Sequence, residues 1–249
     1  MSRWKASSIH LSISALIATA VLALMLLLWY PYPLFEAVGG RLVLLILLGV
    51  DVSLGPLITL IIFNSKKSRK ALAFDLSVIA LLQITALIYG MSVVFLARPV
   101  FVVFSKNSFD LVTANMLSDA DIAKARYPEF RSLPLTGPVY VYTELPSGIK
   151  ERNEVTFGAF SGKDLPQFPQ YYQPYTEHGS AAAKAAKPVA QLRKLNPDHN
   201  DEIDDAVSHS GKTEAELGYL PLRAKYQHQA VLVEQNGGRV LKVLPMNPW

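Results

Sequence analysis

The sequence has no cysteine among its 249 residues, so the chain forms no disulfide and carries no thiol chemistry. It also lacks the short motifs of common enzymes. No nucleophile elbow of the form G-x-S-x-G occurs. Gly162-Lys163 does not complete a phosphate-binding loop, because Gly158 lies one residue too close and Asp164 stands where Ser or Thr is required.

Histidine is scarce as well, at five residues. His199 and His209 lie in a stretch rich in aspartate and glutamate, but their spacing matches no zinc motif. A solvated acidic helix explains this stretch better than a metal site does. We therefore expect no catalytic, cofactor-binding or metal-binding residue, and we expect that the protein is not an enzyme.

Long apolar runs are what the sequence has instead. Hydrophobic residues make up 51% of the chain and are concentrated before Arg98. Three runs, at about residues 9–30, 42–63 and 71–96, each have roughly the 20 residues that cross about 30 Å of hydrocarbon. The first run also fits a signal peptide, but the residues after the small-residue pattern 18–20 stay apolar, which favours a retained helix. We predict three transmembrane α-helices within residues 1–98.

The distribution of charge predicts the topology of these helices. Residues 1–97 carry seven cations and three anions, whereas the rest of the chain carries 17 of each, so the net charge of +4 belongs to the membrane half. Four of the cations lie in the turn 64–70, between the second and third runs. Because Lys and Arg near helix ends are retained on the inner side, we expect a cytoplasmic amino terminus and a periplasmic carboxy-terminal domain in a multi-pass inner-membrane protein. A nucleic-acid partner is not expected, since the soluble half is neutral.

Residues 99–249 have the composition of one globular domain. We predict strands at 100–104, 109–113 and 139–143, and a hairpin of 230–234 with 239–244 around Asn236-Gly237. Helices are predicted at 147–160, at 180–194 with a kink at Pro188, at 201–208, and from a capping box at Ser118 to Pro128. The fold class is therefore a three-helix membrane domain followed by one α+β domain with a mostly antiparallel sheet.

Polar side chains in the membrane runs are the sharpest chemical signal, because an ionisable group there is costly. Counted outward from Lys67, Asp51 and Gln83 stand at the same depth, and Thr19 falls near that level. We predict a polar layer in which a protonated Asp51 bonds to the Gln83 amide. Asp75 is shallower and fits a first-turn acid close to Lys70, favoured by the helix dipole. This difference in depth argues against a paired-aspartate protease.

An aromatic and proline-rich stretch follows Asp164. It contains Phe168, Tyr171, Tyr172 and Tyr175. These rings form either an ordered loop packed on its own domain or a docking surface for a partner, because aromatic side chains supply contact area at low entropic cost. The sequence leaves both interpretations open.

The whole chain resembles the type IV pilin accessory proteins of the TfpX/TfpZ kind. The resemblance rests on three amino-terminal spans and on a series of short blocks, namely Val50-Asp51-Val52-Ser53-Leu54-Gly55-Pro56-Leu57, Arg98-Pro99-Val100-Phe101-Val102-Val103-Phe104, Pro128-Glu129-Phe130-Arg131-Ser132-Leu133-Pro134, Ser161-Gly162-Lys163-Asp164-Leu165-Pro166, Tyr171-Tyr172 and Pro248-Trp249. It implies no catalytic residues. It implies an inner-membrane protein that works with the major type IV pilin, and with inner-membrane pilus assembly components, to influence pilus assembly, retraction and surface piliation.

Three classes of function follow for testing. The first is a non-enzymatic modulator of pilus assembly that contacts pilin, in which Asp75 holds the terminal amine of the pilin helix. The second is a membrane-anchored sensor whose periplasmic domain binds a ligand and acts through a partner. The third is a membrane enzyme that acts on pilin. The resemblance favours the first class.

Overall fold

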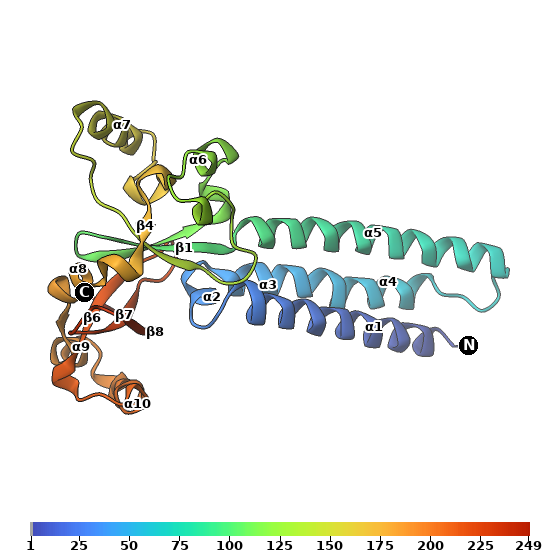
Figure 1. Ribbon diagram of the computed structural model, residues 1–249. Coiled ribbons are helices and arrows are strands. Elements are labelled where there is room, and N and C mark those ends of the chain that lie inside the picture. Colours follow the sequence, from blue (N-terminus) through green and yellow to red (C-terminus); the bar gives the residue numbers. More distant parts are fainter. Residues whose placement is uncertain (1) are drawn as a thin grey trace. The chain divides into compact units, whose positions relative to one another are not determined.

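The structure is a computed structural model that describes residues 2–249, apart from the side chains at positions 43, 47, 48, 50 and 51. The chain forms two compact units. A helical unit contains the residues up to Trp29 together with Gly40–Leu96, and a soluble unit contains Tyr30–Gly39 together with Ala97–Trp249. Figure 1 traces both units in sequence colours.

Two helices of the helical unit are long and apolar enough to cross a membrane. The first is α1 (Arg3–Leu24), which continues as the π-helical turn η1 (Met25–Trp29), and the second is α5 (Arg69–Leu96). Their 27 and 28 residues exceed the roughly 20 that a span requires. They coincide with the first and third predicted runs.

The middle run has a different structure from the single helix that we predicted. It consists of α3 (Gly40–Leu48), the π-helical segment η2 (Gly49–Leu54) and α4 (Gly55–Ile62). Pro56, the second residue of α4, has no backbone N–H, so regular α-helical hydrogen bonding is interrupted before it. The part of the chain that the structure describes thus contains two candidate spans rather than three.

The soluble unit is built on one mixed sheet. Its strands are β1 (Pro99–Ser105), β2 (Ser108–Thr113), β3 (Val139–Tyr142), β4 (Gln173–Pro174), β5 (Lys187–Pro188), β6 (Leu217–Arg223), β7 (Gln229–Glu234) and β8 (Val240–Leu244). The order is β4-β3-β1-β2-β6-β7-β8, and β5 also pairs with β6. The β1–β3 and β2–β6 pairs are parallel, and the remaining pairs among the described residues are antiparallel.

Strand β6 was not predicted, because it contains Pro221, which normally excludes a central strand. The pairing explains how it is accommodated. One edge of β6 is shared, since β5 pairs with Gly218 and Tyr219, whereas β2 pairs with Leu222 and Arg223. Pro221 lies in the gap between these two partners, where a missing N–H breaks no ladder bond.

Five α-helices and six short 3₁₀ turns surround the sheet in the described residues. Ser118 caps α6 through the predicted capping box, but α6 ends at Ala123 rather than at Pro128, and the Ala-rich region is divided at Pro188 into two helices. The helices are α6 (Asp119–Ala123), α7 (Ile149–Phe160), α8 (Tyr175–Ala185), α9 (Val189–Leu195) and α10 (Asn200–Ser210). The 3₁₀ turns are η3 (Ala114–Met116), η4 (Pro128–Phe130), η5 (Leu165–Gln167), η6 (Pro169–Tyr171), η7 (Pro197–His199) and η8 (Glu214–Glu216).

The link between the first two helical segments belongs to the soluble unit. It contains the short helix α2 (Leu34–Ala37), and both Leu34 and Ala37 are buried in the core beside β1, β2 and β7. The Gln229 side-chain amide donates to the Pro33 carbonyl at 2.9 Å, and the Tyr226 N–H donates to the Ala37 carbonyl at 3.1 Å. Residues far apart in the sequence therefore build one core.

Candidate functional site

A polar layer crosses the helical unit and joins three of its helical segments. His10 of α1 lies between Thr59 of α4 and Gln83 of α5. Its Nε2 is 2.7 Å from Gln83 Oε1, and its Nδ1 is 2.6 Å from Thr59 Oγ1. Because an amide oxygen only accepts, the Nε2 N–H of His10 donates to Gln83, and Nδ1 forms the second hydrogen bond with the Thr59 hydroxyl. The layer is thus a continuous chain of hydrogen bonds across three helical segments.

The sequence block around Gly55 makes room for this layer. A Cβ at Gly55 would lie 2.0 Å from Gln83 Nε2, so the absence of a side chain lets α4 and α5 approach. One residue on, the Pro56 carbonyl accepts a hydrogen bond from Ser7 Oγ of α1 at 2.8 Å. Small residues that permit close backbone approach are the usual device for packing helices in lipid. The Gly-Pro pair therefore sets the contact between α4 and its two neighbours.

A polar layer is present, but its residues differ from those that we predicted. Gln83 belongs to it, but the Thr19 hydroxyl donates to the Ala15 carbonyl of its own helix at 2.8 Å and is exposed. His10, which the sequence reasoning missed, occupies the position on α1 that we had assigned to Thr19. The Asp51 side chain lies outside the described residues, so its predicted bond to Gln83 stays a prediction.

Asp75 lies near the start of α5 and forms an ion pair. Its carboxylate is 2.6 Å from Lys67 Nζ, and both side chains are partly exposed. Because α5 begins at Arg69, Asp75 lies beyond its first turn, and the cation is Lys67 rather than Lys70, which we had predicted. The charge of Asp75 is thereby balanced within the hairpin, so a partner's amine would have to compete with Lys67.

A hollow of about 330 Å³ adjoins the polar layer between α1 and α5. His10 and Gln83 supply its polar atoms, and the small residues Ser14 and Ala80 lie in its wall. The remaining lining is aliphatic and consists of Ile13, Ile17, Leu76, Ile84 and Leu87. The hollow thus has an apolar wall that carries one partly buried hydrogen-bonded pair.

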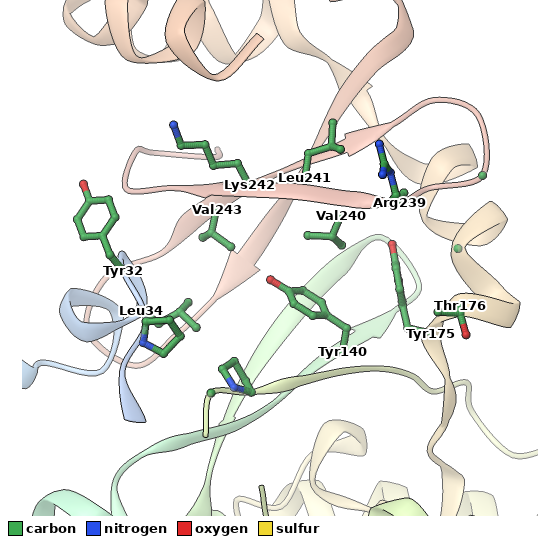
Figure 2. Close-up of a pocket in the computed structure, with 15 residues that line it drawn as sticks. Tyr32, Leu34, Tyr140, Tyr175, Thr176, Arg239, Val240, Leu241, Lys242 and Val243 are labelled. Carbon is green, nitrogen blue, oxygen red and sulfur yellow. The ribbon is translucent and has the colours of Figure 1, made fainter. Parts of the chain in front are cut away.

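A larger groove, of about 810 Å³, lies in the soluble unit (Figure 2). Strand β8 forms one wall, and Tyr140 of β3 and Tyr175 of α8 form the other together with Leu34 of the link. Burial raises the pKa of Tyr140 to about 12, so its hydroxyl is a neutral donor at physiological pH. The complete lining is Pro31, Tyr32, Leu34, Gly137, Pro138, Tyr140, Tyr175, Thr176, Gly179, Gly237, Arg239, Val240, Leu241, Lys242 and Val243.

The aromatic stretch proposed as a docking loop is largely internal. Phe168, Tyr172 and Tyr175 are buried, and Tyr171 is half-buried. Tyr172 contacts Phe101 of β1 with ring centroids 5.1 Å apart. Burial of these rings agrees with a loop that packs on its own domain, and a docking role for this stretch stays a prediction.

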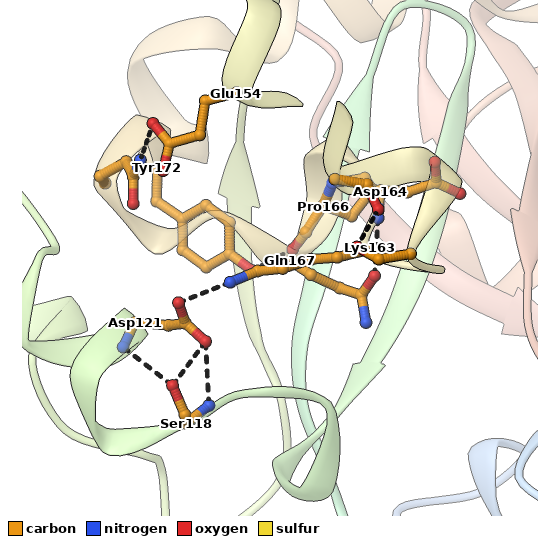
Figure 3. Close-up of polar contacts among 11 residues, drawn as sticks. Ser118, Asp121, Glu154, Lys163, Asp164, Pro166, Gln167 and Tyr172 are labelled. Carbon is orange, nitrogen blue, oxygen red and sulfur yellow. Dashed lines mark hydrogen bonds and ion pairs between the residues drawn. The ribbon is translucent and has the colours of Figure 1, made fainter. Parts of the chain in front are cut away.

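A polar network fixes the block 161–166 beside this stretch (Figure 3). Lys163 Nζ lies 2.5 Å from Asp121 Oδ1, and the same carboxylate accepts from Ser118, the cap of α6. Burial opposes ionisation of Asp121, but the bonds from Lys163 and Ser118 and the charge of Lys163 prevail and lower its pKa. The Tyr172 hydroxyl donates to the Pro166 carbonyl. The network braces η5 against α6, which gives this block a structural role.

No metal centre was predicted, and in residues 2–249 as described there is no group of three or more His, Cys, Asp or Glu side chains placed to hold a metal ion. Two hollows adjoin the features described above, the one beside the layer at His10 and the groove along β8, and both have largely apolar walls.

Comparisons with a family model and with curated proteins identify the same family. The family described as "Fimbrial assembly protein FimB" matches residues 1–39. A curated relative from Dichelobacter nodosus, "Fimbrial assembly protein, serogroup E1", is 34% identical over 219 residues, which cover 88% of this chain and 85% of the relative. Its counterpart of serogroup I is 33% identical with the same coverage. No solved structure matches this chain. With this identity over most of both lengths, the chain belongs to the fimbrial assembly protein family.

Proposed function

We propose that this protein is a non-enzymatic inner-membrane accessory factor of type IV fimbrial biogenesis, of the TfpX/TfpZ kind, which acts by contact with the major pilin. The names of its relatives support a role in fimbrial assembly. The observation that carries the proposal is the apolar hollow between α1 and α5, closed by the bonded pair His10 and Gln83.

The proposed topology has three membrane crossings, with α3, η2 and α4 together forming the middle one. The basic turn with Lys66, Lys67, Arg69 and Lys70 is cytoplasmic, and the soluble unit is periplasmic. Alkaline phosphatase fused after Leu117 should then be active in cells. An inactive fusion at this position would refute the topology.

The hollow between α1 and α5 suits the single apolar helix of a membrane-resident pilin. Its small wall residues, Ser14 and Ala80, permit close approach of another helix, which is how helices associate in lipid. His10 and Gln83 are hydrogen-bonded to each other, so an apolar helix that covers them would not leave their hydrogen bond unmade. Contact along α1 and α5 would hold pilin beside this protein before assembly.

Crosslinking in cells tests this contact with a matched pair of positions. A photoreactive residue at Leu87 faces the hollow, whereas one at Ile88, the adjacent position of α5, does not line it and is 65% exposed. We expect a pilin adduct at position 87 and little at position 88. Equal adducts at both positions, or none at either, would contradict the proposed contact.

The non-enzymatic part of the proposal has a separate test. A deletion strain should carry fewer surface pili while its pilin is processed normally and has an unchanged mass, because the proposed action is contact rather than chemistry. Intact-mass measurement of pilin from the deletion and parent strains makes the comparison. A pilin of altered mass would indicate an enzyme that acts on pilin.

A further inference from the structure

Strand β8 is the last strand of the sheet order and has an open edge. The Glu234 N–H donates to the Arg239 carbonyl, so Glu234 faces β8. Backbone groups alternate in direction along an antiparallel strand, so Leu232 also faces β8, where it pairs with Lys242. Val243, the next residue, therefore directs its N–H and C=O away from β7. Within the described residues neither group has a hydrogen-bond partner.

The groove of about 810 Å³ runs along this open edge. Five consecutive residues, 239–243, line it. The register shift at Leu241 interrupts the regular alternation of side chains, so residues from both faces of β8 border the groove along its backbone edge. Figure 2 agrees: Val240 and Val243 point toward Tyr140, whereas Leu241 and Lys242 lie on the other side of β8.

The hairpin that carries β8 is held firmly at its turn. The Tyr175 hydroxyl donates to the Gly238 carbonyl at 2.6 Å. A Cβ on Gly238 would lie 1.8 Å from the Gly179 carbonyl oxygen of α8, so the turn and the helix are in backbone contact. The groove is thus formed before any ligand arrives, and binding would require little ordering of the protein.

We propose that the open edge of β8 binds an extended segment of the pilin subunit by strand addition. This inference rests on the proposed function for the identity of the partner. The open N–H and C=O of Val243 require a polypeptide backbone, and the wall of Tyr140, Val240 and Leu34 takes apolar side chains at alternate positions. Tyr140 and Tyr175 face the edge across the groove.

Charge contributes little to this recognition. Arg239 is 2.6 Å from Glu234, and Lys242 is 3.1 Å from Asp205, so the cations beside the edge are already paired. Backbone bonds and apolar contacts therefore supply the affinity. We expect binding to change less than about threefold between 50 mM and 300 mM salt, since screening acts mainly on unpaired surface charge.

The test uses the full chain in lipid nanodiscs and fluorescent 12-residue peptides tiled over the periplasmic part of the pilin of the same organism. One or two overlapping peptides should bind by fluorescence anisotropy, and their scrambled versions should not. In hydrogen–deuterium exchange, the bound peptide should slow exchange in residues 239–244 and leave the opposite sheet edge at β4 unchanged. Binding without protection of residues 239–244 would overturn the proposal, as would failure of every peptide.

Two substitutions at one position separate backbone from side chain. Val243→Pro removes the outward N–H, and Val243→Ala removes the side chain but keeps that N–H. We expect about tenfold weaker binding for proline and less than about threefold weakening for alanine, because the lost bond also leaves a peptide carbonyl unpaired. Equal effects would refute strand addition. If Val243→Pro fails to fold, Tyr140→Ala takes its place, with a loss of about tenfold expected and an unchanged affinity counting against the proposal.

The outcomes also separate this inference from the function on which it rests. Light scattering that shows a dimer abolished by Val243→Pro would assign the edge to a second copy and overturn the proposal. If no peptide binds while the photoreactive residue at Leu87 still crosslinks to pilin, the membrane contact is supported and strand addition is refuted. If a peptide binds while position 87 gives no pilin adduct, strand addition is supported and the membrane contact is refuted.

Discussion

Thr59 and Thr19 carry the same side chain in two helices of the helical unit, and they allow a direct measurement of the polar layer. Thr59 is buried at 2% exposure and bonds to His10 across helices, whereas Thr19 is exposed and bonds to its own helix. Substitution by valine keeps the branched shape and removes the hydroxyl. We expect Thr59→Val to destabilise the helical unit by about 1 kcal/mol, within the roughly 0.6 to 2 kcal/mol of interhelical bonds in membranes. Thr19→Val should change the stability by less than about 0.3 kcal/mol.

The assay is equilibrium unfolding in mixed micelles, followed by tryptophan fluorescence. A Trp249→Phe background removes the single tryptophan of the soluble unit and leaves Trp4 and Trp29 as reporters of the helical unit. A loss of 1 kcal/mol corresponds to about a fivefold change in the folding equilibrium, which this measurement resolves. If both valine variants lose the same stability, or if Thr59→Val is neutral, the layer contributes nothing specific and the reasoning fails.

Three further predictions concern single positions. Gly238→Ala should lower the free energy of unfolding by roughly 3 kcal/mol, because φ is +70° and the new Cβ meets the Gly179 backbone. Gly237 has φ +85° but open space around it, so Gly237→Ala should lower the free energy by only about 1 kcal/mol. Urea unfolding measures both. Asp121→Asn should destabilise the protein at pH 7 and make no difference to its stability at low pH. The native pKa of Asp121 is lowered, so the carboxylate contributes its full stabilisation above the ordinary carboxyl pKa near 4. This stabilisation is lost as the pH falls through the native pKa. Asp75→Asn should reduce pilin co-purification at an unchanged protein level if Asp75 holds the pilin amine, and unchanged recovery would exclude that role.

Local signals predicted much of the soluble fold. The Asn-Gly turn placed β7 and β8, the capping box at Ser118 placed the start of α6, and the apolar runs after Arg98 placed β1 and β2. Strand β6 was missed because Pro221 argues against a strand unless the neighbouring pairings are known. The core position of the link was missed for the same reason, since Leu34 and Ala37 are held by residues almost 200 positions away.

The polar layer shows the limit of counting residues. Depth alone matched Gln83 with Asp51 and placed Thr19 near that level, but on α1 the residue that bonds to Gln83 is His10, nine positions before Thr19. The helices begin at different positions and have different lengths, so counting residues from one turn does not give the same depth in each helix. A single imidazole in an apolar run was the available signal, because an ionisable side chain there requires a partner. The aromatic stretch gave no single prediction for a different reason: its composition is the same whether the rings face inward or outward.

The burial of α2 in the sheet core has a consequence for biosynthesis. Leu34 and Ala37 leave the ribosome nearly 200 residues before β7, whose Gln229 holds the carbonyl of Pro33. The link must therefore wait, unpaired, until almost the whole chain has been translated. A fragment that starts at residue 97 would lack two core side chains, so the soluble unit is complete only in a chain that also contains residues 30–39.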